Sequence, residues 1–427
     1  MYEPELEPLG GGIQLNGGLA SLASVLSSDE VSELLRVCVG MSGVISNTYV
    51  TEENEMDQLL SLDAEEALRR VDDLYLKELG VVSSVTILRS TLLKFLISKC
   101  EEKKKKGDGV EFELKEEKVV RVDARPEEVF VTMEGDGKEK AYDLVLGCDG
   151  LSSEVKSSLP ELRSSSIYSG LRILYSVSEP YEWKGGGAAE GLGRKKKLRQ
   201  FFGEGCYQLK GTYGYDSEKV CDMSAIVYKG NKRGENTAWE KEDLYEDFVR
   251  RSKLVGGSRE DAADEKSSKF IELGVYFHNP FNKWSNDFNN VILAGDSAHA
   301  MPPFLGQGGN QGMQDGVMLG KLIGEGVEGE VLAKQFRRRW RKTTLITAKS
   351  IFLGYLETGG GKVADFRDNF FRFAGKVGLA RKVFVDGATP FPSPREIWDG
   401  VGEVGLLEQL QLALQVVKDP TQFMEDE

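Results

Sequence analysis

The chain has 427 residues, of which 40% are hydrophobic and 29% are charged, and these values are typical of a globular protein with two or three domains. It contains only two histidines, and five cysteines without a CxxC pair. This excludes a multi-histidine metal centre and a zinc site and leaves few options for a Ser-His or Cys-His hydrolase. A net charge of −14 argues against a nucleic-acid-binding protein, because phosphate neutralisation needs a basic surface. If the chain is an enzyme, a cofactor is therefore expected to carry the difficult chemistry.

The cysteines and the hydropathy bear on where the protein works. Five cysteines without a pairing pattern indicate reduced thiols, hence a reducing compartment such as the cytoplasm or the plastid stroma. The sequence holds no run of 18 apolar residues, so we expect a soluble protein without a membrane-spanning segment. Targeting and oligomeric state stay open.

Helix and strand signals alternate in the first third of the chain. Apolar residues recur at helical spacing in 19–37, and 85–99 predicts a short strand that enters a helix. Residues 111–122 and 129–134 alternate apolar and polar side chains, as strands do. Such an alternation of elements is typical of an α/β domain.

Two short apolar runs further along predict strands buried on both faces, which is typical of a parallel sheet. The first, Leu144–Leu146, leads into Gly147-Cys-Asp-Gly150, and the second, Val291–Ala294, leads into Gly295-Asp296. Between them, residues 165–284 alternate in aromatic-rich segments, which predicts an antiparallel sheet inserted into the α/β domain.

Three other segments are distinctive in composition. Gly185–Lys197 predicts a loop, and Leu406–Val417 predicts an amphipathic helix packed on the body of the protein. The basic run Arg337–Lys342 is interpreted as a solvated helix face anchored by Trp340 rather than as a membrane or nucleic-acid patch, since the chain as a whole is acidic.

Glycine is over-represented, with 49 residues or about 11% against a usual ~7%. Two strings fit GxGxxG, at 324–329 and 400–405, but neither follows a strand and opens a helix inside a βαβ unit, so both are interpreted as loops. The informative glycines lie in 291–322. There a buried strand ends at Gly295-Asp296, Pro302-Pro303 stiffens the loop, and a run of glycines opens an apolar-periodic helix whose small residues permit close packing. A glycine loop at a helix N-terminus suits a ligand with negative charge.

These segments resemble the motifs of the flavin-dependent monooxygenases with the para-hydroxybenzoate hydroxylase fold. Residues 291–322 are similar to the GD motif of that family, and Asp143–Lys156 is similar to its DG motif. Pro8–Leu15 and Leu88–Leu93 match two further motifs in the family order. The resemblance spans roughly residues 2–345, and zeaxanthin epoxidase is one member whose activity would fit.

The resemblance implies an FAD-binding site and no metal. Asp296 would hold the ribityl hydroxyls, Arg89 would neutralise the pyrophosphate, and Asp149 would orient Arg89 and shape the groove that FAD and NAD(P)H use. Glu3 would bind the adenosine ribose, and Gly306–Asn310 would face the isoalloxazine. The full set of implied cofactor-binding residues is Glu3, Arg89, Asp149, Gly150, Gly295, Asp296, Pro303, Gly306, Gln307, Gly308, Gly309 and Asn310.

The fold that the resemblance implies is α/β with an α+β insert. A Rossmann-like FAD-binding domain would be formed by 1–160 and 285–345, an antiparallel substrate domain by 161–284, and a C-terminal helical region by 346–427. The family opens with a strand, a GxGxxG turn and a helix. This chain starts after that unit, so we expect the first part of the FAD-binding domain to be incomplete. A truncated gene or a fragment would explain this, as would a shortened non-catalytic protein or completion by another chain.

The activity that the resemblance implies is an NAD(P)H- and O2-dependent monooxygenation. Reduced FAD would form a C4a-hydroperoxide that hydroxylates or epoxidises a small hydrophobic organic substrate. No residue is assigned as catalytic, because the flavin carries the chemistry, and His299 is interpreted as a positioning residue. The aromatic residues expected to roof the substrate pocket are Tyr175, Phe201, Phe202, Tyr207, Tyr213, Tyr215, Tyr228 and Phe277.

Two alternatives to a monooxygenase stay open. The first is a reductase on the same fold, which passes hydride from FAD to an alkene. The second is a binding module that is not catalytic. The substrate, its regiochemistry and the choice between NADH and NADPH stay open as well.

Overall fold

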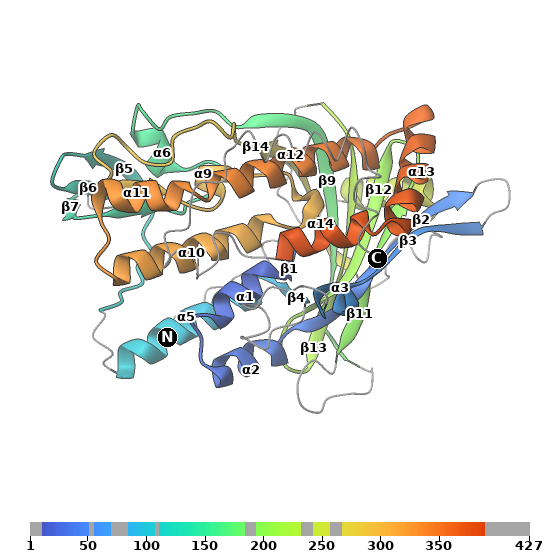
Figure 1. Ribbon diagram of the computed structural model, residues 1–427, viewed down its shortest axis with the longest axis horizontal. Coiled ribbons are helices and arrows are strands. Elements are labelled where there is room, and N and C mark those ends of the chain that lie inside the picture. The colour runs from blue at the N-terminus through green and yellow to red at the C-terminus, as the bar shows by residue number, and fades with distance from the viewer. Residues whose placement is uncertain are drawn as a thin grey trace.

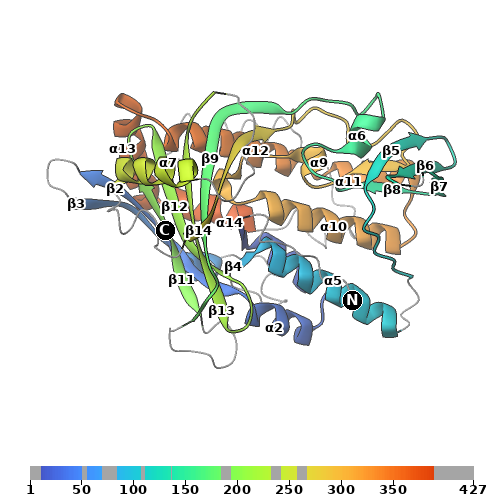
Figure 2. The same ribbon diagram turned by 180° about the vertical axis from the view of Figure 1, so that it is seen from behind.

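A ten-stranded mixed sheet stands at one end of the molecule, and long helices run from it toward a three-stranded sheet at the other end (Figures 1 and 2). The computed structural model describes residues 11–50, 55–69, 84–106, 111–135, 137–183, 194–231, 242–256 and 267–388. The strands of the large sheet are β1 (Gly12–Leu15), β2 (Val39–Val50), β3 (Glu55–Asp63), β4 (Val85–Leu88), β9 (Ile167–Ser178), β10 (Tyr181–Glu182), β11 (Lys195–Phe202), β12 (Cys206–Gly214), β13 (Lys219–Lys229) and β14 (Ser267–Phe277).

The large sheet joins segments that are far apart in the sequence. Its order is β1-β4-β2-β11-β12-β13-β9-β14, with β3 paired to β2 and β10 paired to β13. From β11 to β14 all neighbours are antiparallel, which confirms the sheet predicted for 165–284. β2 runs parallel to β11, with Ile45 opposite Arg199. The sheet predicted for 165–284 therefore also includes strands from before residue 160. The domain limits expected from the sequence stay predictions.

One predicted loop and one predicted strand are corrected. Lys195–Lys197 lie at the start of β11, where they pair with β2, whereas 184–193 lies outside the described residues. Residues 111–118 have no strand structure, and the strand begins at Val119. Both stretches carry charged and largely exposed side chains, and pairing with a distant strand decides whether such a stretch is extended.

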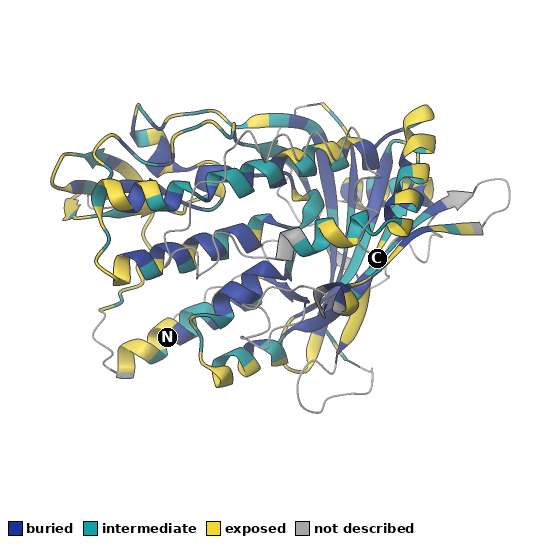
Figure 3. Ribbon diagram, in the orientation of Figure 1, coloured by how far each residue is buried: buried dark blue, intermediate teal, exposed yellow. Residues whose placement is uncertain are grey.

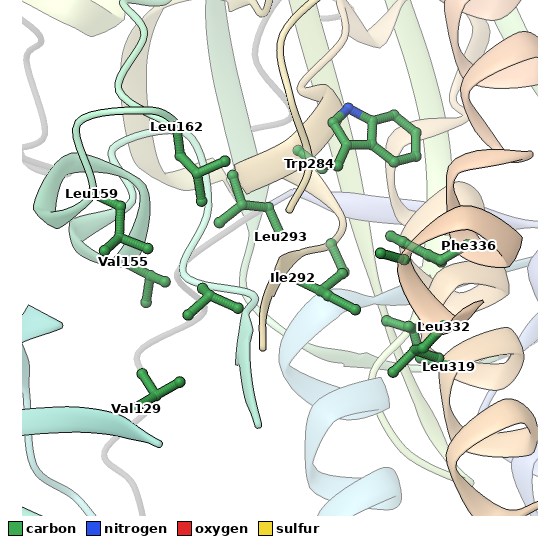
Figure 4. Close-up of a cluster of buried hydrophobic side chains, with 14 of the residues drawn as sticks. Val129, Val155, Leu159, Leu162, Trp284, Ile292, Leu293, Leu319, Leu332 and Phe336 are labelled. Carbon is green, nitrogen blue, oxygen red and sulfur yellow. The ribbon is translucent and has the colours of Figure 1, made fainter. Parts of the chain in front are cut away.

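A parallel pair of short strands forms the second sheet. The strands of the two smaller sheets are β5 (Val119–Ala124), β6 (Val129–Met133), β7 (Glu139–Tyr142), β8 (Val145–Gly147) and β15 (Val291–Leu293). β8 and β15 are parallel, with Ile292 opposite Leu146, and β5, β6 and β7 are antiparallel. In Figure 4, Leu293 lies toward Leu162 and Ile292 toward Phe336. β15 is therefore buried on both faces, as its apolar run predicts.

Helices pack on both faces of the large sheet, and several of them link it to β15. They are α1 (Gly17–Ala23), α2 (Ser28–Arg36), α3 (Ala64–Arg69), α5 (Arg89–Lys106), α6 (Glu154–Ser158), α7 (Glu242–Ser252), α9 (Asp296–His299), α10 (Gly308–Gly324), α11 (Gly329–Arg337), α12 (Trp340–Glu357), α13 (Lys362–Lys376) and α14 (Leu379–Ala388), with single turns η1 (Lys253–Val255) and η2 (Pro303–Leu305). Figure 3 shows α1 largely buried between other elements and the end of α5 exposed.

The helices predicted near the N-terminus are confirmed. Residues 19–37 contain most of α1 and all of α2. Ser27, directly before α2, forms a capping box with Glu30. Residues 85–99 contain β4, which leads directly into α5. Within the described part of the chain, none of the helices combines the length and the apolarity that crossing a membrane requires.

Two glycine strings and two other predicted features can be compared with the described residues. The GxGxxG-like string at 324–329 spans the end of α10 and the start of α11, which confirms that it is not a nucleotide-binding turn. The second string, at 400–405, lies outside the described residues, as do the predicted helix Leu406–Val417 and the expected ribose-binding residue Glu3.

Candidate functional site

The chain turns sharply where β15 ends. Gly295 has φ 60° and ψ −140°, a conformation that side-chain-bearing residues rarely adopt, and its N–H donates to Asp315 Oδ2 at 2.8 Å. Its Cα lies 3.9 Å from the position that a Cβ on Gly312 of α10 would take. The turn makes Asp296 the first residue of α9, and its side chain is exposed to solvent.

Asp296 and Arg89 form a charged edge beside this turn. Arg89 opens α5 directly after β4 and is exposed. Desolvation by the surrounding protein raises the pKa of Asp296, and the nearby His299 and Arg89 oppose that rise. A carboxylate in this position can accept hydrogen bonds from hydroxyl groups, and an exposed guanidinium suits a phosphate.

The residues of the DG motif follow β8. Gly150 has φ 83°, and a Cβ there would meet nothing within 4 Å, so its backbone faces open space. Asp149 accepts a hydrogen bond from Val155 N–H at 3.0 Å, in the first turn of α6. A contact between Asp149 and Arg89 is not among the hydrogen bonds and ion pairs of the described residues, so the orienting role of Asp149 stays a prediction.

The loop from Pro303 to Gly309 ends in an open helix N-terminus. Pro303 starts η2, Gly306 follows with φ 62°, and α10 begins at Gly308. The side chain of Gln307, at the cap position, accepts no hydrogen bond from the first backbone N–H groups of α10, and Gly309 is exposed. The first backbone N–H groups of α10 therefore lack a side-chain cap, an arrangement that suits a ligand atom with negative charge.

Asn310 ties α10 to the N-terminal segment. Its Oδ1 accepts hydrogen bonds from the N–H groups of Asn16 at 3.0 Å and Gly18 at 2.9 Å. Its Nδ2 donates to the carbonyl oxygens of Gln14 at 2.7 Å and Gly306 at 3.0 Å. The amide can make four hydrogen bonds and all four are made within the protein. The Asn310 side chain thus positions α10, and only its backbone N–H can serve a ligand.

Asp315 is a buried hub beneath the turn, and sequence reasoning missed it. Its Oδ1 accepts from Arg339 Nε at 2.9 Å, and its Oδ2 lies 2.5 Å from His299 Nε2 and accepts from Gly295 N–H. Burial acts to raise the pKa of Asp315, but His299 and Arg339, together with the Gly295 hydrogen bond, outweigh it and lower the pKa to about 2. His299 therefore has a positioning geometry, as expected from the sequence.

Arg339 overturns the interpretation of Arg337–Lys342 as a solvated face. Its side chain is 1% exposed and donates to Gln314 Oε1 at 2.7 Å and to Gln311 Oε1 at 2.8 Å, besides Asp315. Trp340 does anchor the segment, because its Nε1 donates to the carbonyl oxygen of Pro280. A signal was present: Gln311, Gln314 and Asp315 fall on one face of α10, and a polar face on a buried helix needs a polar partner.

The small residues of α10 differ in their surroundings. Gly312 packs against the turn at Gly295, as expected. A Cβ on Gly316 or Gly320 would meet nothing within 4 Å. The expectation that these two glycines permit close packing is therefore wrong.

Known proteins match this chain in sequence over limited segments. The profile of a family described as FAD binding domain matches residues 223–335. Monooxygenase 2 from Arabidopsis thaliana is 33% identical over 109 residues, which cover 20% of this chain and 26% of that protein. Kynurenine 3-monooxygenase from Drosophila willistoni is 38% identical over 69 residues, which cover 16% of this chain and 15% of that protein.

The fold matches over almost the whole chain. The crystal structure of HpxO from Klebsiella pneumoniae, complexed with FAD and uric acid, has a TM-score of 0.64 to this chain at 15% identity, and the match covers 89% of this chain and 88% of that one. Parts of the chain are thus similar in sequence to FAD-dependent monooxygenases. The predicted resemblance and the predicted fold class are thereby confirmed. The sequence matches span about a quarter or less of the length of these two curated relatives.

The described residues fit the FAD of this family. The exposed carboxylate of Asp296 suits the hydroxyls of the cofactor, the guanidinium of Arg89 suits its phosphates, and the uncapped start of α10 at Gly308 suits the electron-rich edge of its ring. The turn at Gly295 and the open backbone of Gly150 leave room for close approach. The zeaxanthin-epoxidase-like activity stays a prediction.

Proposed function

We propose that the chain is an FAD-dependent monooxygenase. It would hydroxylate or epoxidise a small hydrophobic organic substrate with O2 and NAD(P)H. The observation that carries this proposal is the turn after β15, where an exposed carboxylate, an exposed guanidinium and an uncapped helix N-terminus surround one glycine of positive φ. When bound, FAD supplies the transfer of electrons from the nicotinamide to O2.

The residues of the chain bind, orient and shield. Asp296 would accept hydrogen bonds from the ribityl hydroxyls of FAD, and Arg89 would pair with its pyrophosphate. The N–H groups at the start of α10 would stabilise negative charge on the flavin ring. Asp315 holds the Gly295 N–H and thereby fixes the direction in which Asp296 points. The buried side chains around Tyr207 would shield one side of the reaction site from water.

The test measures FAD binding and oxygen transfer by the full chain. We expect the purified protein to bind FAD with the visible absorbance of a flavoprotein, and Asp296→Asn to weaken FAD binding about tenfold through the loss of a charge-assisted hydrogen bond. Asp365→Asn on the exposed face of α13 is the matched control and should leave FAD binding unchanged.

Isotopically labelled O2 separates the possible activities. A monooxygenase places one labelled atom in the product and consumes NAD(P)H in step with O2. NAD(P)H oxidation that continues without O2 and leaves the product unlabelled would identify a reductase instead. A chain that does not bind FAD at all would contradict both enzyme functions and leave the binding module.

We infer that the protein works in a reducing compartment. All five cysteines are free, and Cys100 and Cys148 are exposed. Exposed unpaired thiols persist where glutathione and thioredoxin keep them reduced. Labelling of the exposed thiols in intact cells tests this inference, since oxidised cysteines would not react.

A further inference from the structure

One row of side chains across the large sheet is open to solvent while its neighbours are not. Gln200 on β11 lies opposite Leu209 on β12, which lies opposite Ala225 on β13, which lies opposite Tyr175 on β9. All four are partly exposed. We call these four residues the open row.

The rows beside the open row are closed. On one side, Phe202, Tyr207, Val227 and Ile173 are all buried. On the other side, Met223 and Val177 are buried as well. Solvent therefore reaches the middle of a sheet face whose surroundings are packed. Three of the four side chains that it reaches, those of Leu209, Ala225 and Tyr175, offer apolar surface. Such a surface suits the face of an aromatic ring.

Phe304 connects this surface to the FAD loop. It lies in η2, the turn that directly precedes Gly306. Its ring is half-buried, and the centroid of that ring is 6.4 Å from the centroid of the Tyr207 ring. A Cβ on Gly354 of α12 would be 2.2 Å from the Phe304 ring, so α12 presses against the loop at this point. Three residues after Gly354, α12 ends at Glu357.

Glu357 is buried at the end of the open row with an oxygen that has no partner. The side chain is 2% exposed, and Gln200 Nε2 donates to its Oε1 at 3.4 Å, which is a long hydrogen bond. The Tyr207 hydroxyl also hydrogen-bonds to this carboxyl group. Oε2 is buried without any hydrogen-bond partner among the described residues. Leaving a buried polar atom unpaired is costly, so a folded protein tolerates it where a ligand completes the contact.

Arg367, the cation whose charge acts on Glu357, is already engaged. Arg367 donates through Nε to Asp368 at 2.7 Å and through Nη1 to the carbonyl oxygen of Gly203 at 2.9 Å. Burial raises the pKa of Glu357 to about 8, against opposing hydrogen bonds from Tyr207 and Gln200 and the charge of Arg367. The carboxyl group is therefore neutral near pH 7, and its proton needs an acceptor.

We propose that Glu357 is a specificity-determining residue, which binds the oxygen atom of a neutral aromatic substrate whose ring lies on the open row. The inference rests on the proposed function for the reaction at this site. A neutral carboxyl group and the Tyr207 hydroxyl can donate to and accept from a phenol or a carbonyl. They offer no positive charge, and Arg367 is held by Asp368 and backbone carbonyls, so an aromatic carboxylate should be a poor ligand.

The test uses three probes of one shape: 2-naphthol, 2-naphthoate and naphthalene. Calorimetry on the full chain, with and without added FAD, measures their dissociation constants. We expect 2-naphthol to bind more tightly than both other probes. Glu357→Leu should weaken 2-naphthol binding about tenfold and leave naphthalene within about twofold, because only the polar contact is lost. Glu357→Gln, which keeps a donor and an acceptor, should restore most of the 2-naphthol affinity.

Two further variants separate this role from a structural one. Glu330→Leu, at an exposed position of α11, is the matched control and should leave all three dissociation constants unchanged. Ala225→Phe fills the open row and should abolish binding of all three probes while FAD still binds. The melting temperature of ligand-free Glu357→Leu should equal or exceed that of the parent, since an unpaired buried group is removed.

Three results would overturn the proposal. They are an unchanged 2-naphthol affinity in Glu357→Leu, a tighter binding of 2-naphthoate than of 2-naphthol, and a lowered melting temperature with loss of FAD in both Glu357 variants. Failure of the proposed function is a separate outcome, because it would show as absent FAD binding while the measurements without FAD still report on Glu357.

Discussion

At the scale of single residues, Asp315 is a fully buried carboxylate that contacts both Arg339 and His299. Asp315→Asn keeps the shape and an acceptor for Gly295 N–H, but it leaves the guanidinium of Arg339 buried without a counter-charge. We expect the free energy of unfolding to fall by about 3–5 kcal/mol, measured by urea denaturation. Asp365→Asn, at an exposed position of α13, should change it by less than about 0.5 kcal/mol. A loss below about 1 kcal/mol in Asp315→Asn would show that Arg339 finds another partner.

A second prediction at the residue scale concerns Glu357 and the pH dependence of folding stability. Its pKa is raised from 4.5 to about 8 in the folded protein, where Tyr207 and Arg367 are the ionisable neighbours. The folded chain therefore keeps a proton that the unfolded chain releases, and stability is lost as the pH rises from about 4.5 to 8, by at most about 1.4 kcal/mol per pH unit. The stability of Glu357→Gln relative to the parent should grow across this window. Parallel curves for the two proteins would contradict the raised pKa.

At the scale of elements, substitution by alanine should change folding stability in opposite directions at two helical glycines, Gly18 and Gly316. A Cβ on Gly18 of α1 would lie 2.8 Å from Asn310 Oδ1 and 3.2 Å from its Cα, so Gly18→Ala should push α1 from α10 and cost about 1–3 kcal/mol. Gly316→Ala on α10 meets no atom within 4 Å and should stabilise by about 0.5–1 kcal/mol. Thermal unfolding of both variants measures the difference. Equal changes in the stability of the two variants would show that α1 and α10 do not meet closely at Gly18.

At the scale of the whole molecule, elements with a local sequence pattern could be predicted, whereas contacts between residues far apart in the sequence could not. The parallel pair β8–β15 followed from the apolar runs Leu144–Leu146 and Val291–Ala294. Burial on both faces was right for β15 and wrong for β8, where the Leu146 side chain is exposed. The pairing of β2 with β11 joins residues about 150 positions apart and has no local signal. Arg339 looked solvated for the same reason, since its partner Asp315 lies 24 positions earlier. Glu357 is visible only once the sheet, α12 and the FAD loop are assembled.

The proposed cofactor site draws on α5, α9 and α10, so FAD should stabilise the whole molecule and not one part of it. A ligand that binds only the folded state adds about 2.7 kcal/mol at a concentration one hundred times its dissociation constant. We expect the melting temperature to rise more with FAD than with riboflavin, which lacks the pyrophosphate that Arg89 would pair with. Arg89→Met should narrow that difference and leave the riboflavin shift unchanged. An FAD shift of full size in Arg89→Met would remove Arg89 from the site and leave Asp296 and the start of α10 to hold the cofactor.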